Sequence, residues 1–274
     1  MEHKHKTPNI IFGSGVSSPK GYENLLAVAQ EAVQNGCRGF DTAPSYKTEV
    51  VLGKVIRECM LQNNLSRKDF FIQSKVDGWQ MQEGHISKYI TTALNEMEIE
   101  YFDSLLVHWP MQEYFDKTWE SLLQIQKEGK VKDIGICNVR LRHLKAFADK
   151  GILPKYIQIE RHPLMIFEKE IEFCKANNII VQVYSPLCKM HPHLKESQKL
   201  KMLAEKYNKN IGQIILRWQI DTGVVPVFTS TKPERVKSNL DIFDFILSEE
   251  DIAIVSSLNE NYKLCLESIA CPGF

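Results

Sequence analysis

Four polar side chains, Asp41, Tyr46, Lys75 and His108, stand at or just after the ends of apolar runs. GCRGFDTAPSY carries Asp41 and then Tyr46, DFFIQSK ends in Lys75, and YFDSLLVHWP carries His108. A positioned phenol can give its proton to the oxygen of a carbonyl group. An imidazole can hydrogen-bond and orient that same oxygen. These residue types together predict proton transfer at a carbonyl or alcohol.

The charges of Lys75 and Asp41 make this chemistry more specific. A lysine at the end of an apolar strand is costly to bury alone, and Asp41 supplies the counter-charge. We expect the Lys75 cation to lower the pKa of Tyr46 from its usual value of about 10 toward neutrality. None of the four residues carries hydride, so carbonyl reduction or alcohol oxidation implies a nicotinamide cofactor.

Each of these residues also has a purely structural interpretation. Asp41 can serve as a turn or helix-capping residue before Pro44, and Lys75 with Asp41 can form a structural ion pair. His108, which precedes Trp109 and Pro110, can be a buried histidine with its hydrogen bonds satisfied. Four chemically matched residues on three neighbouring strand ends favour catalysis over these interpretations.

Short apolar runs alternate with longer, charged segments of helical periodicity along the chain. The predicted strands are Asn9–Gly13, Arg38–Asp41, Phe70–Ser74, Ser104–His108, Asp133–Cys137, Tyr156–Ile159, Ile179–Tyr184 and Val224–Phe228. The predicted helices are Glu23–Asn35, Glu49–Gln62, His85–Met97, Phe115–Glu128, Leu141–Asp149, Glu168–Asn177, Gln198–Tyr207 and Ile211–Asp221, with a later one after Ser248.

Eight such units predict a (β/α)8 barrel, an α/β fold, formed by residues 1–274 as a single domain. A doubly wound open sheet is the alternative. It would need a glycine fingerprint after the first strand, and Gly13-Ser14-Gly15 lacks the third glycine. In a barrel, the strand ends would place Asp41, Lys75, His108, Asn138, Gln158, Tyr184 and Ser230 around one polar mouth.

Composition narrows the possible partners. The formal net charge is zero, from 34 basic and 34 acidic residues, which argues against nucleic-acid or polybasic membrane binding. The seven cysteines include Cys271 and show no paired CxxC spacing, so we expect reduced thiols in a cytoplasmic protein. No apolar run reaches membrane-spanning length, and the N-terminus has no secretory h-region.

Several of these segments resemble the aldo-keto reductase family, in order along the chain. GFDTAPSYKTEVVLGKVI resembles its signature around the catalytic tyrosine, and SLLVHWP resembles its strand with the active-site histidine. GKVKDIGICNV, IQIERHPL, VQVYSPL and PVFTSTKPERVKSNLDIFDF resemble later segments, so the match runs from about Gly13 to Leu258. The resemblance implies a usually monomeric barrel that binds NADP(H) and reduces small carbonyl compounds.

By the same resemblance, Tyr46 is the general acid, Asp41 and Lys75 tune it, and His108 orients the carbonyl. Asn138 and Gln158 match contacts to the nicotinamide carboxamide, and Tyr184 matches the residue that stacks on the ring. The full set of expected cofactor contacts is Cys137, Asn138, Gln158, Tyr184, Ser185, Leu187, Thr229, Ser230, Thr231, Arg235 and Asn239.

The sequence departs from the family pattern at three positions. Cys137 stands where serine is usual, Thr229 where a phosphate-binding lysine is frequent, and Ser238 where glutamate is common. NADP(H) is the expected cofactor, with Arg235 and Lys232 supplying positive charge, and NAD(H) stays open.

Three further interpretations accompany the main one. Trp79 and Trp109 are expected walls of the substrate pocket, with simple packing as the alternative. The group Cys188, His191 and His193 has a spacing unlike common zinc patterns, so we expect no metal site. The alternative function is a nicotinamide-binding regulatory module whose catalysis is vestigial.

Overall fold

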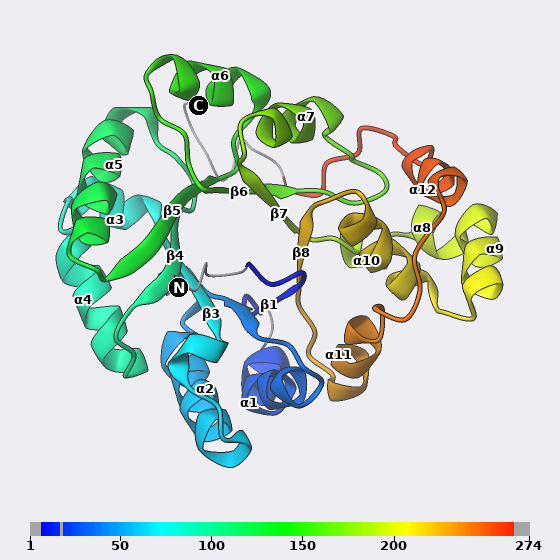
Figure 1. The fold of residues 1–274 in the computed structure, drawn as a ribbon, viewed down its shortest axis with the longest axis horizontal. Coiled ribbons are helices and arrows are strands. Elements are labelled where there is room, and N and C mark those ends of the chain that lie inside the picture. Colours follow the sequence, from blue (N-terminus) through cyan, green and yellow to red (C-terminus); the bar gives the residue numbers. More distant parts are fainter. Residues whose placement is uncertain (1–6, 17–18, 266–274) are drawn as a thin grey trace, which may run out of the picture.

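The protein folds as a closed barrel of eight parallel strands surrounded by helices (Figure 1). The computed structural model describes residues 7–16 and 19–265. The strands follow in chain order around the barrel, and β8 pairs with β1 to close it. They are β1 (Ile11–Gly13), β2 (Gly39–Asp41), β3 (Phe71–Val76), β4 (Phe102–Val107), β5 (Val131–Cys137), β6 (Tyr156–Glu160), β7 (Ile180–Tyr184) and β8 (Val225–Phe228). The predicted (β/α)8 architecture is confirmed.

Every strand is followed by at least one helix before the next strand begins. The α-helices are α1 (Pro19–Gln34), α2 (Glu49–Asn63), α3 (Gly78–Glu83), α4 (Ile86–Met97), α5 (Gln112–Lys127), α6 (Leu141–Asp149), α7 (Glu168–Ala176), α8 (Pro192–Glu196), α9 (Gln198–Tyr207), α10 (Ile211–Asp221), α11 (Pro233–Leu240) and α12 (Glu249–Ser256). Short 3₁₀ turns are η1 (Pro44–Tyr46), η2 (Arg67–Asp69) and η3 (Cys188–Met190).

The differences from the sequence-based prediction lie in short elements. Helices α3, α8 and α11 have at most eight residues, too few for a clear apolar periodicity. Strand β3 runs through Val76, so Lys75 lies inside the strand and not after it. Strand β4 ends at Val107, which leaves His108 as the first residue beyond it. The late helix begins as predicted, because the side chain of Ser248 accepts a hydrogen bond from the backbone of Asp251.

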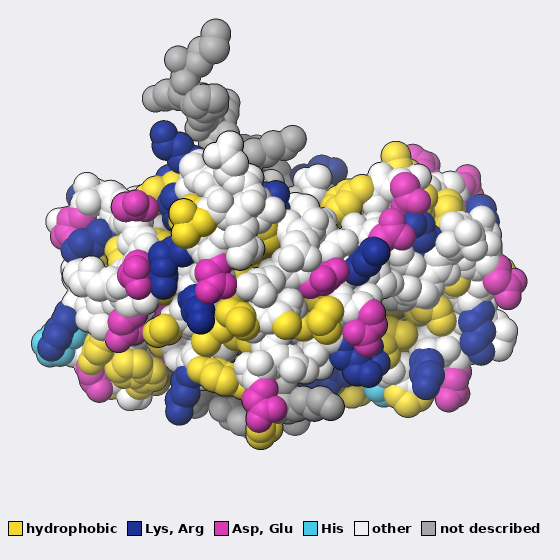
Figure 2. Space-filling view, turned by 90° about the horizontal axis from the view of Figure 1, so that it is seen from below, with side chains coloured by type: hydrophobic (Ala, Val, Ile, Leu, Met, Phe, Trp, Pro, Cys, Tyr) yellow, Lys and Arg dark blue, Asp and Glu magenta, His cyan; other side chains and the backbone are white. Residues whose placement is uncertain are grey.

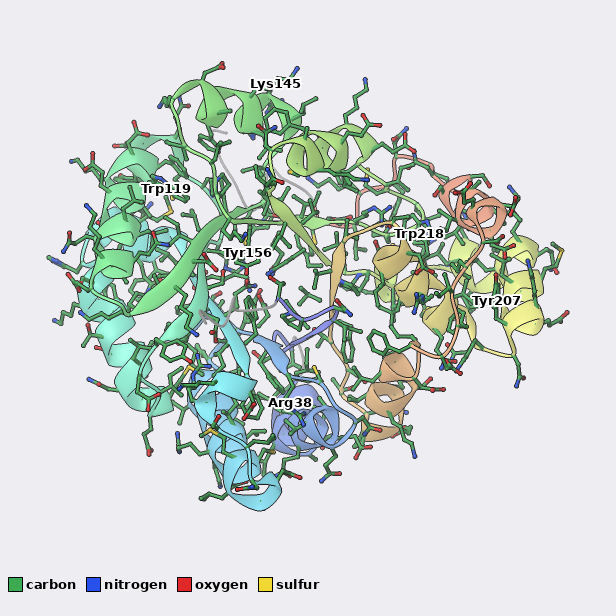
Figure 3. All side chains as sticks on the ribbon, viewed as in Figure 1. Arg38, Trp119, Lys145, Tyr156, Tyr207 and Trp218 are labelled. Carbon is green, nitrogen blue, oxygen red and sulfur yellow. The ribbon has the colours of Figure 1, made fainter. Side chains whose placement is uncertain are left out.

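Two apolar layers hold the barrel together. The larger one lies between the strands and the helices, because both faces of a parallel sheet are covered. A smaller cluster contains side chains from six strands that alternate with those facing the helices; its members are Ile11, Phe71, Leu106, Cys137, Tyr156 and Val227. Tyr156 is labelled inside the circle of strands in Figure 3. Its aromatic ring meets the Phe71 ring edge-on, with ring centroids 5.8 Å apart. This cluster, the apolar plug, fills part of the barrel interior, and its members Leu106 and Cys137 are paired in register with Lys75 and Gln158.

The outer surface carries both signs of charge. Figure 2 shows lysine and arginine side chains interspersed with aspartate and glutamate on the face in view. Among the described helices, none is long and apolar enough to cross a membrane. The described cysteines (Cys37, Cys59, Cys137, Cys174, Cys188 and Cys265) are all free thiols, and Cys271 lies outside the described residues.

Candidate active site

The four residues predicted to act on a carbonyl meet at the C-terminal end of the barrel. Asp41 is the last residue of β2, and Tyr46 ends the turn η1 that follows. Lys75 is the fifth residue of β3, and His108 follows β4 directly. Because β2, β3 and β4 are parallel neighbours, their C-terminal ends lie side by side and bring these groups together.

A buried ion pair forms the base of the site. The ammonium group of Lys75 donates to Asp41 Oδ1 at 2.5 Å and to the backbone oxygen of Thr42 at 3.0 Å. The Lys75 side chain is fully buried. Burial opposes its charge, but Asp41, together with smaller effects of Tyr46 and Cys137, outweighs burial, so the pKa of Lys75 is raised above its ordinary value. Lys75 therefore remains a cation inside the barrel.

The hydroxyl of Tyr46 lies between this cation and an imidazole. Its oxygen is 3.4 Å from Lys75 Nζ and 3.3 Å from His108 Nε2. The tyrosine ring meets the His108 ring edge-on. Gly15 packs against the other side, where a Cβ atom would come within 3.1 Å of the tyrosine ring. A larger residue at position 15 would crowd the Tyr46 ring, so glycine leaves the space that this ring occupies.

The ionisation of Tyr46 differs from the prediction. Burial raises the pKa of the phenol to about 12, although the Lys75 cation acts to lower it. We expected Lys75 to bring this pKa below its ordinary value, and that expectation is wrong. Loss of hydration destabilises the tyrosinate more than the nearby Lys75 cation stabilises it. Tyr46 keeps its proton at neutral pH, the form needed to donate it.

His108 has a carboxylate partner that the sequence did not reveal. Its Nδ1 lies 2.5 Å from Oδ1 of Asp77, the residue just after β3. Asp77 Oδ2 also accepts a hydrogen bond from the backbone of Ser45 at 2.7 Å. Burial lowers the pKa of His108, while the hydrogen bond to Asp77 acts to raise it. Asp77 and His108 are 31 residues apart in the sequence, so no local pattern indicated their contact.

Three buried glutamines surround the second oxygen of Asp41. Gln73 donates to Asp41 Oδ2 at 2.6 Å, and Gln158 donates to it at 3.0 Å. Gln182 accepts from both of these amides and donates back to Gln73 at 2.8 Å. The network spans β3, β6 and β7, and its carboxylate and amides hydrogen-bond across the barrel. It therefore fixes the orientation of Asp41 beneath Lys75.

Replacing Gln73 by leucine is expected to lower the free energy of unfolding by about 1–3 kcal/mol. The buried acceptors on Asp41 and Gln182 each lose one of their two glutamine donors, and the Gln182 amide loses its acceptor. Urea unfolding of both proteins measures the change. The matched control is Gln82→Leu, at an exposed position on α3, which should leave the unfolding midpoint nearly unchanged. Equal effects of the two substitutions would contradict this role of Gln73.

The predicted nicotinamide contacts lie on neighbouring strands beside the four central residues. Asn138 follows β5 in a left-handed backbone conformation, with φ of 59°. Its amide donates to the backbone oxygen of His108 and accepts from the Tyr184 hydroxyl, both at 2.8 Å. Tyr184 ends β7 with a partly exposed ring. Two amides, Asn138 and Gln158, beside an aromatic face fit a carboxamide-bearing ring, provided that their present partners are exchanged.

The predicted adenosine-phosphate contacts lie where β8 leads into α11. The Ser230 hydroxyl accepts from the backbone of Lys232 at 3.1 Å, and Asn239 is buried on α11. Arg235 lies in the first turn of this helix and is exposed. Helix N-termini favour phosphate groups, and in barrels the loops after the seventh and eighth strands often hold them. The donors in this loop therefore fit a phosphorylated cofactor.

The structure shows the contacts of the three residues that depart from the family pattern, and of Thr231. Thr229 is exposed, and its Oγ1 lies close to Gly13, where a Cβ atom would come within 2.9 Å. Ser238 Oγ accepts a hydrogen bond from Asn210, the cap of α10. Cys137 is fully buried in the apolar plug, and burial raises the pKa of its thiol. Thr231 accepts from Asn24 through its backbone oxygen.

The remaining predicted contacts lie at the rim of the barrel, and their roles stay predictions. Ser185 and Leu187 follow β7, and both are partly exposed. Trp109 lies beside His108, with ring centroids 6.3 Å apart. Trp79 on α3 is 45% exposed and packs on Tyr89 of α4 at 4.9 Å. Both tryptophans therefore keep the two interpretations given to them, pocket wall and packing.

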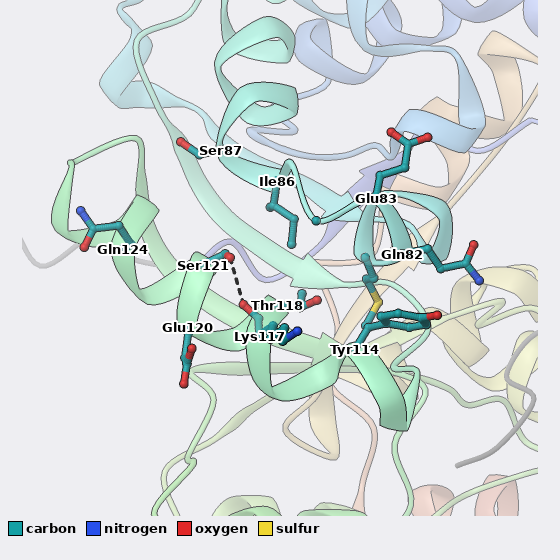
Figure 4. Close-up of a pocket in the computed structure, with 12 residues that line it drawn as sticks. Gln82, Glu83, Ile86, Ser87, Tyr114, Lys117, Thr118, Glu120, Ser121 and Gln124 are labelled. Carbon is teal, nitrogen blue, oxygen red and sulfur yellow. Dashed lines mark hydrogen bonds between the residues drawn. The ribbon is translucent and has the colours of Figure 1, made fainter.

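Two other features lie apart from the four central residues. His193 contacts Glu260, and His191 stacks near Tyr262. Within the described ranges, no group of three or more His, Cys, Asp or Glu side chains could hold a metal ion. A polar groove between α3, α4 and α5 is lined by residues that include Gln82, Tyr114 and Gln124, and by none of the four (Figure 4).

Comparisons with known proteins agree with this geometry. A sequence profile of the Aldo/keto reductase family matches residues 9–260. The chain is 34% identical to a glyoxal reductase of Bacillus subtilis (strain 168), over 92% of this chain and 90% of that protein. It is 30% identical to methylglyoxal reductase DkgA of Yersinia pestis, with the same coverage. Its fold superimposes on an aldo-keto reductase of Bombyx mori in complex with NADP, with a TM-score of 0.89, 25% identity, and coverage of 96% and 92% of the two chains.

Proposed function

The chain belongs to the aldo/keto reductase family and is an oxidoreductase, and we propose that it reduces small aldehydes and ketones to alcohols with NADPH. One observation carries the proposal: the phenol of Tyr46 lies within 3.4 Å of a buried lysine and 3.3 Å of an imidazole at the barrel mouth. That arrangement is a proton donor with charge stabilisation built around it.

Each side chain has a distinct role in this reaction. A bound reduced nicotinamide supplies the hydride, and Asn138, Gln158 and Tyr184 are the residues that would hold its ring. Tyr46 gives its proton to the carbonyl oxygen. Lys75 stabilises the phenolate oxygen that is left behind, and Asp41 keeps Lys75 charged and in place. His108 faces the same oxygen from β4.

The names of two relatives and the polar barrel mouth support a proposal for the class of substrate. Two relatives are named for glyoxal and methylglyoxal, which are small dicarbonyl compounds. Polar groups from several strands line the mouth, which suits compact, polar carbonyls. We propose glyoxal, methylglyoxal and similar aldehydes as substrates of a cytoplasmic, monomeric enzyme.

The direct test is an assay with the purified protein, NADPH and a panel of aldehydes, ketones and sugars. Loss of absorbance at the reduced-nicotinamide band with glyoxal or methylglyoxal supports the proposal. Tight nicotinamide binding without turnover on any carbonyl compound would instead favour the alternative, a cofactor-binding regulatory module.

We expect NADPH to bind about 10- to 100-fold more tightly than NADH, because the 2′-phosphate would gain a charge-assisted hydrogen bond at the start of α11. Fluorescence titration measures both affinities. Arg235→Gln should weaken NADPH binding and leave NADH binding unchanged. Lys237→Gln, on the same helix, is the control and should change neither. Equal or tighter binding of NADH by the unmodified protein would overturn the choice of cofactor.

A further inference from the structure

The contact between Asp77 and His108 gives the imidazole a defined orientation. The carboxylate lies on the Nδ1 side at 2.5 Å, and the Tyr46 hydroxyl lies on the Nε2 side at 3.3 Å. Asp77 is 6% exposed, and the His108 side chain is 12% exposed. The three side chains thus form one continuous chain of polar atoms from the phenol to a buried carboxylate.

Asp77 is itself held rigidly. Its Oδ2 accepts from the backbone of Ser45 at 2.7 Å, and its own backbone N–H donates to Gln80 Oε1 at 2.9 Å. Ser45 immediately precedes Tyr46, so the carboxylate connects the loop of the phenol to the ring of His108. Burial opposes ionisation of Asp77, but its contacts with His108 and its hydrogen bonds from Ser45 together outweigh burial and lower its pKa. Asp77 is therefore an anion that accepts at both oxygens.

This anion decides which nitrogen of His108 carries the proton. A carboxylate that only accepts requires a hydrogen on Nδ1, so the neutral ring presents a lone pair at Nε2. Neutral His108 can then accept a proton from Tyr46 but cannot donate to a carbonyl oxygen. Only the imidazolium form, with hydrogens on both nitrogens, can donate from Nε2. The protonation of His108 thus becomes part of the reaction.

We propose that Asp77 is a positioning residue that locks His108 in the Nδ1–H tautomer and stabilises its imidazolium, which makes His108 the proton relay for Tyr46. The proposal rests on the proposed function. In reduction, the Tyr46 proton goes to the carbonyl oxygen while hydride reaches the carbonyl carbon. The imidazolium then returns a proton from Nε2 to the Tyr46 oxygen and becomes neutral, and solvent restores its proton. In alcohol oxidation each transfer runs in reverse.

The charges around His108 set the direction of its pH dependence. Asp77 and Asp41 favour the imidazolium, whereas Lys75 and burial oppose it, and Tyr46 is the group that exchanges the proton. In reduction, kcat/KM should be high below the pKa of His108 and should fall as pH rises through it. Removal of the Asp77 charge should lower that pKa, so the fall should move to lower pH.

The experiment compares kcat/KM for carbonyl reduction across pH in the wild type and in Asp77→Asn. We expect the midpoint of the fall to move down by about one to two pH units, the equivalent of losing one charge-assisted hydrogen bond. Asp69→Asn is the matched control, since Asp69 also accepts backbone and side-chain hydrogen bonds, from Ser66, but lies on the exposed turn η2. Its profile should match the wild type.

A second measurement reads the tautomer of His108 in the wild-type protein. Nitrogen chemical shifts of ¹⁵N-histidine-labelled wild type, with His108 assigned by His108→Gln, report which ring nitrogen carries hydrogen. A hydrogen on Nδ1 at high pH supports the proposal, and a hydrogen on Nε2 alone overturns it. An unchanged midpoint in Asp77→Asn overturns it as well. If the wild type bound cofactor but reduced no carbonyl compound, the proposed function itself would fail, which is a separate outcome.

Discussion

Tyr46→Phe is expected to lower kcat for carbonyl reduction by about two to four decades, the usual effect of removing a positioned general acid. Phenylalanine keeps the ring against Gly15 and beside His108 but has no proton to give. Cofactor affinity should survive, because the proposed nicotinamide contacts lie on β5, β6 and β7. Steady-state kinetics with an aldehyde, together with NADPH titration, measures both quantities.

The control for this substitution is Tyr89→Phe, which removes an exposed phenol on α4 that hydrogen-bonds Glu83. It should leave kcat within about twofold of the wild type, since a surface change away from the site alters little. Full activity of Tyr46→Phe would mean that another group donates the proton. Loss of cofactor binding together with activity would mean that the substitution acts through the fold.

Lys75→Met is expected to lower the free energy of unfolding by about 3–5 kcal/mol, because removal of one partner leaves the Asp41 carboxylate uncompensated in the barrel. Gln73 and Gln158 still donate to Asp41, but neither supplies positive charge. Urea or thermal unfolding measures the change. Activity should fall too, because the phenolate of Tyr46 loses its nearest cation.

A double substitution separates the charge from the packing. Asp41→Asn combined with Lys75→Met removes both charges and should recover most of the lost stability. The surface control is Lys150→Met, which breaks an exposed ion pair with Asp116 and should cost at most about 1 kcal/mol. A double variant no more stable than Lys75→Met alone would show that the charge on Asp41 is not the cause.

Much of the fold could be predicted because it depends on local pattern. Each predicted strand overlaps one strand of the barrel, since a buried parallel strand is apolar along its length. The start of the late helix after Ser248 was predicted because a helix start involves only neighbours along the chain. The short helices α3, α8 and α11 were missed because they carry too little periodicity.

Less of the site could be predicted, because its interactions join residues far apart in the sequence. Gln73, Gln158 and Gln182 look like ordinary polar residues in three separate strands, yet they share hydrogen bonds over sequence separations as large as 109 residues. The net pKa shift of Tyr46 was predicted with the wrong sign. The sequence indicated the nearby cation correctly, but the degree of burial, which dominates, depends on the whole barrel mouth.

The sequence by itself determined the barrel and the chemical types at its mouth, because strand periodicity and residue identity are local properties. It placed Asp41, Tyr46, Lys75 and His108 at neighbouring strand ends. Only the tertiary structure decided the hydrogen-bond partners and the burial of these four side chains, and so their protonation. Asp77, just after β3, contacts His108, just after the neighbouring β4, and three amides join Asp41 in one network inside the barrel. Hydrogen-bond partners and burial follow from the closure of the barrel, and no segment of the chain contains that information alone.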